Sequence, residues 1–219
     1  MKKIILSVLA IAAMATTANA QLWFGGSVGF RHNKNVIKTE NQDTKVPPTN
    51  NFYFSPMVGY DLDEKLSVGG ELDFQHSSSG SVRNVNTEEV EVKSTTTRFG
   101  VTPFARYKFA EFNKFGLVAV ARLPFTYTTG ETSMGSQTTK NNPTTSIGLG
   151  LNPILTYSLN DHFQLECGLN FLSLGASHSV SKDRDNSKNK SISNNFSFGA
   201  NTNNVVNVGN ITIGFIYRL

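Results

Sequence analysis

One short segment combines a histidine and a serine in a spacing that suits hydrolytic chemistry. His76 and Ser78 are separated by one residue, Ser77, in a serine-rich stretch. A serine hydroxyl becomes a nucleophile when a base lies within hydrogen-bond reach and an acid orients that base. Glu88, Glu89 or Glu91, which follow in the same polar stretch, would supply the acid. The segment makes hydrolysis one hypothesis, with His76 as the base and Ser78 as the nucleophile.

Other reactive side chains carry weaker signals. The four histidines are scattered without the spacing of metal ligands, and the single cysteine excludes an internal disulfide framework. The segment from Gly25 to Gly29 matches G-x-S-x-G, but a nucleophile elbow needs a helix after the serine, and none is indicated there. We therefore expect no metal site, no cofactor and no enzymatic activity.

Charged side chains at alternating positions form a larger candidate site. If they share one face of a sheet that closes on itself, they would meet in its interior, where unpaired charges are costly. Two interpretations remain open: a structural network of salt bridges, or the lining of a narrow pore that weakly favours anions. The six basic and four acidic residues are Arg31, Asp61, Glu71, Asp73, Arg98, Arg106, Lys108, Arg122, Glu166 and Arg218.

These side chains lie in segments with a period of two, which indicates strands with two different faces. Eight such runs cover residues 22–32, 52–62, 66–76, 97–109, 115–127, 145–159, 163–171 and 210–219. Short turns alternate along the chain with long polar connectors at 33–51, 77–96, 128–144 and 172–207. In an up-and-down meander, this alternation places all short turns at one end and all long loops, which belong in solvent, at the other.

The N-terminus has the pattern of an export signal. Two lysines precede an apolar run over residues 4–15, and Ala18-Asn19-Ala20 forms a cleavage pattern, so we expect a signal peptide over 1–20 and a mature barrel over 21–219. The chain of 219 residues is 38% hydrophobic and only 16% charged, with a net charge of +4. That charge is too small to indicate nucleic-acid binding, which calls for a basic patch.

The two strand faces differ in side-chain size. One face carries many glycines and serines with interleaved charges, and the other carries large apolar residues. An eight-stranded barrel has little interior room, so the small face should point inward and the apolar face outward to lipid. A soluble barrel with the opposite orientation is the alternative. The outward aromatic residues should form two girdles: Tyr60, Tyr107, Phe109, Phe115, Tyr157, Phe163 and Tyr217 at the short-turn end, and Phe52, Phe54, Phe74, Phe125, Tyr127 and Phe171 at the long-loop end.

Together these features resemble the small eight-stranded outer-membrane barrels of the OmpX and OmpA-barrel kind. The terminal strand from Ile211 to Leu219 is similar to the strand that the outer-membrane assembly machinery reads in that family, although it ends in leucine rather than an aromatic residue. The resemblance implies an all-β transmembrane barrel in a Gram-negative outer membrane, with lipid and lipopolysaccharide around it. It also implies extracellular long loops and periplasmic termini.

The resemblance also orders the functional hypotheses. We expect a structural or surface-binding, adhesion-like role carried by the extracellular loops, which would contact an extracellular ligand. A narrow porin-like channel for small polar solutes is the alternative. The third hypothesis is a lipid A-modifying hydrolase, because the pair of His76 and Ser78 faintly resembles the His-x-Ser element of the outer-membrane lipid A deacylases.

Overall fold

The computed structural model describes residues 21–39, 42–85, 88–168, 172–186, 188–200 and 212–219. The predicted signal peptide at 1–20 therefore lies outside the described residues, as does Phe171 of the predicted aromatic girdle. Within the described part, no helix has the length and apolar character needed to cross a membrane.

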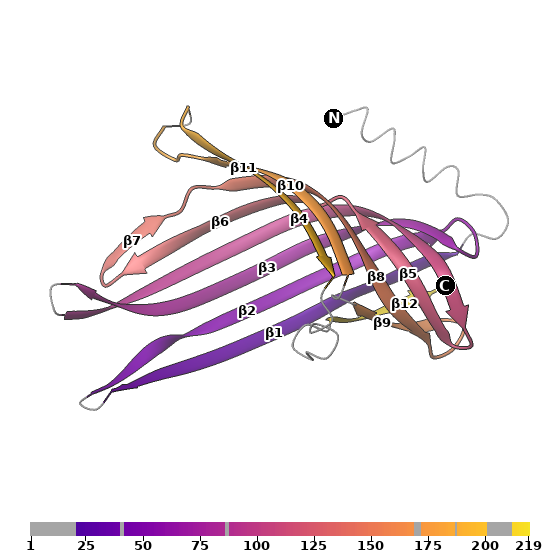
Figure 1. Cartoon of the computed structure of the whole chain (residues 1–219), viewed down its shortest axis with the longest axis horizontal. Coiled ribbons are helices and arrows are strands. Elements are labelled where there is room, and N and C mark those ends of the chain that lie inside the picture. The colour runs from indigo at the N-terminus through magenta and orange to yellow at the C-terminus, as the bar shows by residue number, and fades with distance from the viewer. Residues whose placement is uncertain (1–20, 40–41, 86–87, 169–171, 187, 201–211) are drawn as a thin grey trace.

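Almost all of the described chain is β-strand, and every pairing between its strands is antiparallel (Figure 1). The strands are β1 (Leu22–Thr39), β2 (Gln42–Asp61), β3 (Leu66–Val85), β4 (Glu88–Phe112), β5 (Phe115–Arg122), β6 (Phe125–Met134), β7 (Gln137–Lys140), β8 (Thr144–Ser158), β9 (Phe163–Gly168), β10 (Leu172–Lys182), β11 (Lys190–Ala200) and β12 (Thr212–Arg218).

Eight of these strands close a ring. It runs β1–β2–β3–β4–β5–β8–β9–β12 and returns to β1 through pairs such as Phe24 with Tyr217. β5 and β6 are two halves of one barrel strand, because both lie between β4 and β8 in succession. β9 and β10 likewise follow each other along β8. The predicted eight-stranded antiparallel barrel is confirmed.

The long polar connectors differ from the expectation of open loops. Much of their length continues the barrel strands as hairpins, and those of β1–β2 and β3–β4 project far to the left in Figure 1. The β3–β4 ladder continues without interruption from Leu66–Tyr107 to Val85–Glu88. Threonine and valine favour strands, so cross-strand pairing extends the ladder through segments whose polar composition indicates loops.

Two of the short turns, β2–β3 and β8–β9, are fixed by side-chain caps. Asp63 accepts hydrogen bonds from the backbone N–H groups of Lys65 and Leu66, each at 2.7 Å, and these bonds lower the pKa of Asp63. Asn160 caps the β8–β9 turn in the same way, through the N–H groups of His162 and Phe163. Such local bonds hold a tight reversal of the chain and thereby set the register of the strands on either side.

Exposed apolar side chains on the outward face come from strands all around the barrel. Leu72 is 58% exposed, Val101 53% and Leu149 58%. At the short-turn end the rings of Phe115 and Tyr157 lie 4.8 Å apart. At the other end Phe74 contacts both Phe52 and Phe99 at 6.1 and 5.1 Å. An exposed apolar band of this kind matches the lipid-facing surface of a transmembrane barrel.

The other predicted girdle residues follow the same outward parity. Phe163 packs against Tyr217 at 5.2 Å between ring centroids. Tyr60 is half-buried, whereas the remaining members are exposed: Phe54, Tyr107, Phe109, Phe125 and Tyr127.

Candidate functional site

A layer of buried apolar side chains crosses the inside of the barrel. Its members all have the inward parity of their strands, and they come from five different strands. They are Trp23, Phe104, Val118, Val120, Ile154 and Ile216. Trp23 and Ile216 are completely buried, and the rings of Trp23 and Phe104 stack at 5.8 Å between centroids. The interior of the barrel is thus not filled by polar groups alone.

One buried ion pair completes this layer. Arg106 of β4 donates to Glu166 of β9, and both side chains are almost fully buried. The guanidinium carbon of Arg106 also lies 5.1 Å from the centroid of the Trp23 ring, within cation–π distance. The indole Nε1 of Trp23 donates to Asp61 at 2.9 Å. Aromatic packing and charge pairing therefore close the lumen at the same level.

A polar chamber of about 530 Å³ lies on the short-turn side of the layer. Asp61 collects three donors there: Trp23, the Ser67 hydroxyl at 2.6 Å and Arg218 at 3.0 Å. Lys108 pairs with Glu111 at 2.6 Å near the mouth of the chamber. Arg106 also lines this chamber, so one member of the buried ion pair faces it from the layer.

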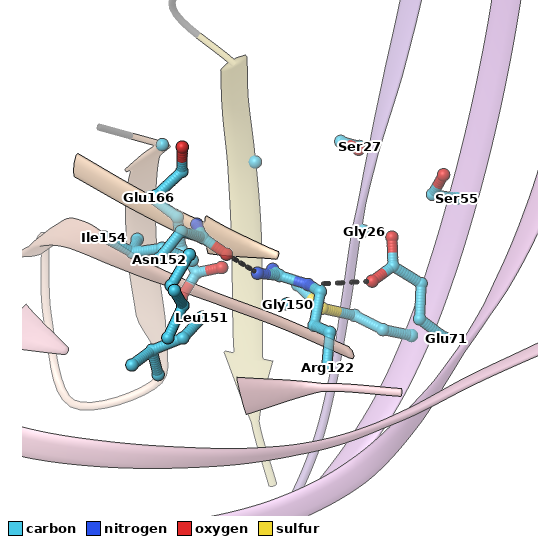
Figure 2. Close-up of a pocket in the computed structure, with 15 residues that line it drawn as sticks. Gly26, Ser27, Ser55, Glu71, Arg122, Gly150, Leu151, Asn152, Ile154 and Glu166 are labelled. Atoms are coloured by element: carbon cyan, nitrogen blue, oxygen red, sulfur yellow. Dashed lines mark hydrogen bonds and ion pairs between the residues drawn. The ribbon is translucent and has the colours of Figure 1, made fainter. Parts of the chain in front are cut away.

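A second chamber, of about 420 Å³, lies on the long-hairpin side. Figure 2 shows Arg122 extended between Asn152, to which it donates at 2.6 Å, and Glu71, whose carboxylate is 3.6 Å away. Further toward the hairpins, Asp73 of β3 accepts a hydrogen bond from the Thr102 hydroxyl of β4 at 2.6 Å. Among the described residues, the two chambers share no lining residue.

The structure brings together most of the charges that the sequence singles out. They form three pairs: Arg106–Glu166, Arg122–Glu71 and Arg218–Asp61. Arg31 and Arg98 are exposed further toward the hairpins. Sequence reasoning missed the partner Glu111 and, above all, the apolar layer. Its signal was present as large apolar residues at inward positions, such as Ile154 between Asn152 and Thr156.

Two inward glycines make room for the aromatic rings of the layer. A Cβ at Gly59 would overlap the Trp23 ring, and one at Gly69 would overlap both the Val58 carbonyl and Phe104. The small residues on the inward face are therefore a packing requirement of the layer.

We expect Gly59→Ala to lower the free energy of unfolding by about 1–3 kcal/mol, because overpacking forces the Trp23 ring out of its site. Urea titration of the refolded barrel, read by gel migration without boiling, measures the change. Gly150→Ala is the matched control, since a Cβ there meets nothing within 4 Å. Equal midpoints for the two variants would contradict the packing argument.

The predicted catalytic pair is not assembled. His76 is exposed, and its Nδ1 lies 3.0 Å from the Thr97 hydroxyl rather than on Ser78. Ser78 is buried at 8% exposure, and its Oγ has no hydrogen-bond partner among the described residues. The two side chains were expected to share an accessible face. Both have the outward parity of β3, but Ser78 is buried and pairs with Asn50 and Thr95 in the neighbouring strands.

The structure also shows no glutamate that acts as the acid of the hypothetical triad among the described side chains. Glu91 is exposed, and the side chains of Glu88 and Glu89 lie outside the described part. Within the described residues no group of three histidine, cysteine, aspartate or glutamate side chains is placed to hold a metal ion.

Three solved structures match nearly the full length of this chain at low sequence identity. Neisserial surface protein A is 12% identical with a TM-score of 0.40, covering 92% of this chain and 100% of its own. The attachment invasion locus protein of Yersinia pestis is 14% identical with a TM-score of 0.38, covering 91% and 98%. A major outer membrane protein from Thermus thermophilus is 13% identical with a TM-score of 0.40, covering 92% and 100%.

No curated protein matches the sequence of this chain. A family model described as the outer membrane protein beta-barrel domain matches residues 4–218, nearly the whole length. With its closed eight-stranded ring and outward apolar band, the chain belongs to the outer membrane protein beta-barrel family.

Proposed function

We propose that this protein is a closed outer-membrane barrel that presents its long hairpins at the cell surface as a binding surface. In this orientation the short turns and both chain termini face the periplasm. The single observation that carries the proposal is the buried layer of Trp23, Phe104, Val118, Val120, Ile154 and Ile216, which crosses the lumen between the two chambers. With the lumen blocked by this layer, the exterior and the hairpins are the parts of the molecule that remain available for a function.

The same layer argues against a channel for polar solutes. A solute would have to displace the stacked rings of Trp23 and Phe104 and to separate the buried pair of Arg106 and Glu166. Breaking a buried ion pair costs about 3–5 kcal/mol, which is too much for a pore that conducts without a conformational change.

The hairpins have the chemistry of a hydrogen-bonding surface. On β10 and β11 the exposed side chains include Ser177, Ser193 and Asn195. Asp185 in the intervening turn and Lys190 at the start of β11 are also exposed. Hydroxyl and amide groups with mixed charges suit the hydroxyl-rich surface of a polysaccharide or glycoprotein, for which no strong single-sign patch is needed.

Trimming the two longest hairpins tests this proposal. One variant replaces residues 34–48 and 82–91, each by a two-residue Asn-Gly turn, so that the pairs Asn33–Thr49 and Ser81–Val92 close the shortened hairpins. We expect intact cells that carry the full chain to adhere to immobilised mucin several times more than cells that carry the trimmed barrel. Gel migration without boiling shows whether both barrels are folded. Equal adherence of the two strains would rule out the β1–β2 and β3–β4 hairpins as the binding surface.

Assembly into the membrane rests on the terminal strand. β12 pairs with both β1 and β9 and so closes the ring. We propose that the outer-membrane assembly machinery recognises its exposed aromatic residues Phe215 and Tyr217, which lie on the outward face. The variant F215S/Y217S is expected to reach the outer membrane in lower amounts, and an unchanged amount in isolated outer membranes would contradict this role.

A further inference from the structure

The outward face changes from apolar to polar within one row of side chains. Phe74, Phe99 and Tyr127 form a row across β3, β4 and β6 through direct register pairs. Two residues further toward the hairpins, the same register aligns His76, Thr97 and Thr129. The two rows are about 7 Å apart along the strands, because a strand rises about 3.4 Å per residue. The polar row therefore borders the apolar band directly.

On two other hairpins, a histidine likewise follows the outward apolar residues. His32 follows Phe30 by two residues on β1, and His178 follows Ala176, the partner of Phe196, on β10. Each ring lies against an asparagine across the ladder: Nδ1 of His32 is 2.6 Å from Asn50 Oδ1, and Nδ1 of His178 is 2.7 Å from the corresponding atom of Asn194. A histidine thus follows the outward apolar residues on three different hairpins.

At this level the outer surface contains a groove of about 390 Å³. It extends from β3 across β4 and β6 to the turn after β10. The residues that carry its chemistry are His76, Thr97, Thr129, Glu131, Lys140 and Arg184.

Arg184 is held over the groove by its own turn. Asp183 accepts hydrogen bonds from the backbone N–H groups of Asp185 and Asn186, which fix the turn that presents Arg184. The guanidinium donates through Nε to the carbonyl of Asn141 at 2.7 Å and through Nη2 to the Thr129 hydroxyl at 2.9 Å. These bonds use two of the five N–H groups of the guanidinium and fix its orientation. The other three N–H groups can then donate to a ligand without a change of the side-chain conformation.

The charges of the groove favour an anion. Arg184 and Lys140 are cationic and exposed, whereas Glu131 is the one carboxylate in the lining and lies opposite Lys140 in the ladder. The hydroxyls of Thr97 and Thr129 add neutral hydrogen-bonding groups. Arginine with lysine and hydroxyl groups is a typical arrangement for a phosphate that carries sugar hydroxyls beside it.

We propose that this groove binds the phosphorylated sugar headgroup of a lipid A-type glycolipid in the outer leaflet. Arg184 and Lys140 contact the phosphate, the threonine hydroxyls contact the sugar, and the acyl chains lie along Phe99 and Tyr127. The position of the groove supports a lipid rather than a free anion, because the apolar band begins one row away. The inference rests on the proposed orientation, in which the hairpin end faces the outer leaflet.

Lipid retention by the purified protein tests the site. The full chain is refolded in detergent without bacterial lipid, mixed with diphosphorylated lipid A, and the bound lipid is counted by native mass spectrometry. We expect the double variant R184Q/K140Q to bind at least about tenfold more weakly than the unchanged chain, since each charge-assisted bond to phosphate contributes on the order of one factor of ten. The matched control is K188Q, which removes a cation from the same turn but outside the groove.

Other probes separate the outcomes. Dephosphorylated lipid A should bind about as weakly to the unchanged chain as diphosphorylated lipid A binds to R184Q/K140Q. Equal affinity of the unchanged chain and R184Q/K140Q for diphosphorylated lipid A would overturn the proposal. Equal binding of phosphatidylglycerol would overturn the recognition of the sugar, and displacement by millimolar inorganic phosphate would indicate a free-anion site instead. The trimmed hairpin variant keeps every groove residue, so loss of adherence and loss of lipid binding are separable results.

Discussion

Replacing Arg106 with methionine is expected to lower the free energy of unfolding by about 3–5 kcal/mol. The substitution leaves the Glu166 carboxylate in a buried site, with its only ion-pair partner among the described residues removed. It also removes the cation above the Trp23 ring. The Glu166 side chain is only 7% exposed, so the variant must keep an unpaired carboxylate in a nearly buried site.

Trp23 itself provides the measurement for this variant. It is the single tryptophan of the chain and lies in the layer, so its fluorescence in a urea titration reports the loss of that layer. The double variant R106M/E166Q removes both charges, and we expect it to recover most of the lost stability, because a neutral pair of similar volume has a much smaller desolvation cost. An R106M midpoint equal to that of the unchanged chain would show that the pair does not stabilise the barrel.

Trp23→Ala is expected to have an effect of similar size, about 3–5 kcal/mol. The indole is completely buried, stacks on Phe104 and donates to Asp61. Its truncation therefore leaves a cavity and removes one of the three donors to a partly buried carboxylate. Urea-dependent gel migration is the measurement here, because this variant has no tryptophan.

The matched control removes an aromatic ring that lies outside the layer. Phe112 at the β4–β5 turn is 83% exposed, so we expect Phe112→Ala to change stability by less than about 0.5 kcal/mol. If W23A and F112A shifted the urea midpoint equally, the layer would not be a principal source of stability.

The barrel was predictable from the sequence because its signal is repeated in every strand. A period of two that places Leu72 outward and Glu71 inward fixes the two faces without any knowledge of pairing. The sequence predicts which charged residues face the interior, but it does not predict which of them pair with one another. That Arg122 contacts Glu71, and Arg106 contacts Glu166, depends on barrel closure, which brings together residues far apart in sequence.

The apolar layer was hidden for the same reason. Val118 and Val120 look like interruptions of the alternation in their own strand. Only the register places them level with Trp23 and Ile154, where they become one layer. Ser78 shows what strand parity cannot predict. Parity places Ser78 on the same outward face as His76, yet Ser78 is buried and His76 is exposed, because parity does not determine local burial beyond the barrel rim.

Composition alone predicts loops where the structure has hairpins, because composition carries no information about strand pairing. Serine and threonine are frequent in loops, yet the ladder from Ser77–Thr96 to Ser81–Val92 is continuous. The groove at Arg184 depends on a turn that reaches across to β6, a contact between residues 55 positions apart that no local pattern encodes.

Single-channel recording in planar bilayers tests the closed lumen most directly. The account predicts no discrete conductance steps for the unchanged chain, because the buried layer and the pair of Arg106 and Glu166 separate the two chambers. A variant that empties the layer, W23A/F104A/I216A, is expected to show steps if it folds, and it serves as the positive control. Discrete, reproducible steps from the unchanged chain would contradict the closed barrel and restore the channel hypothesis.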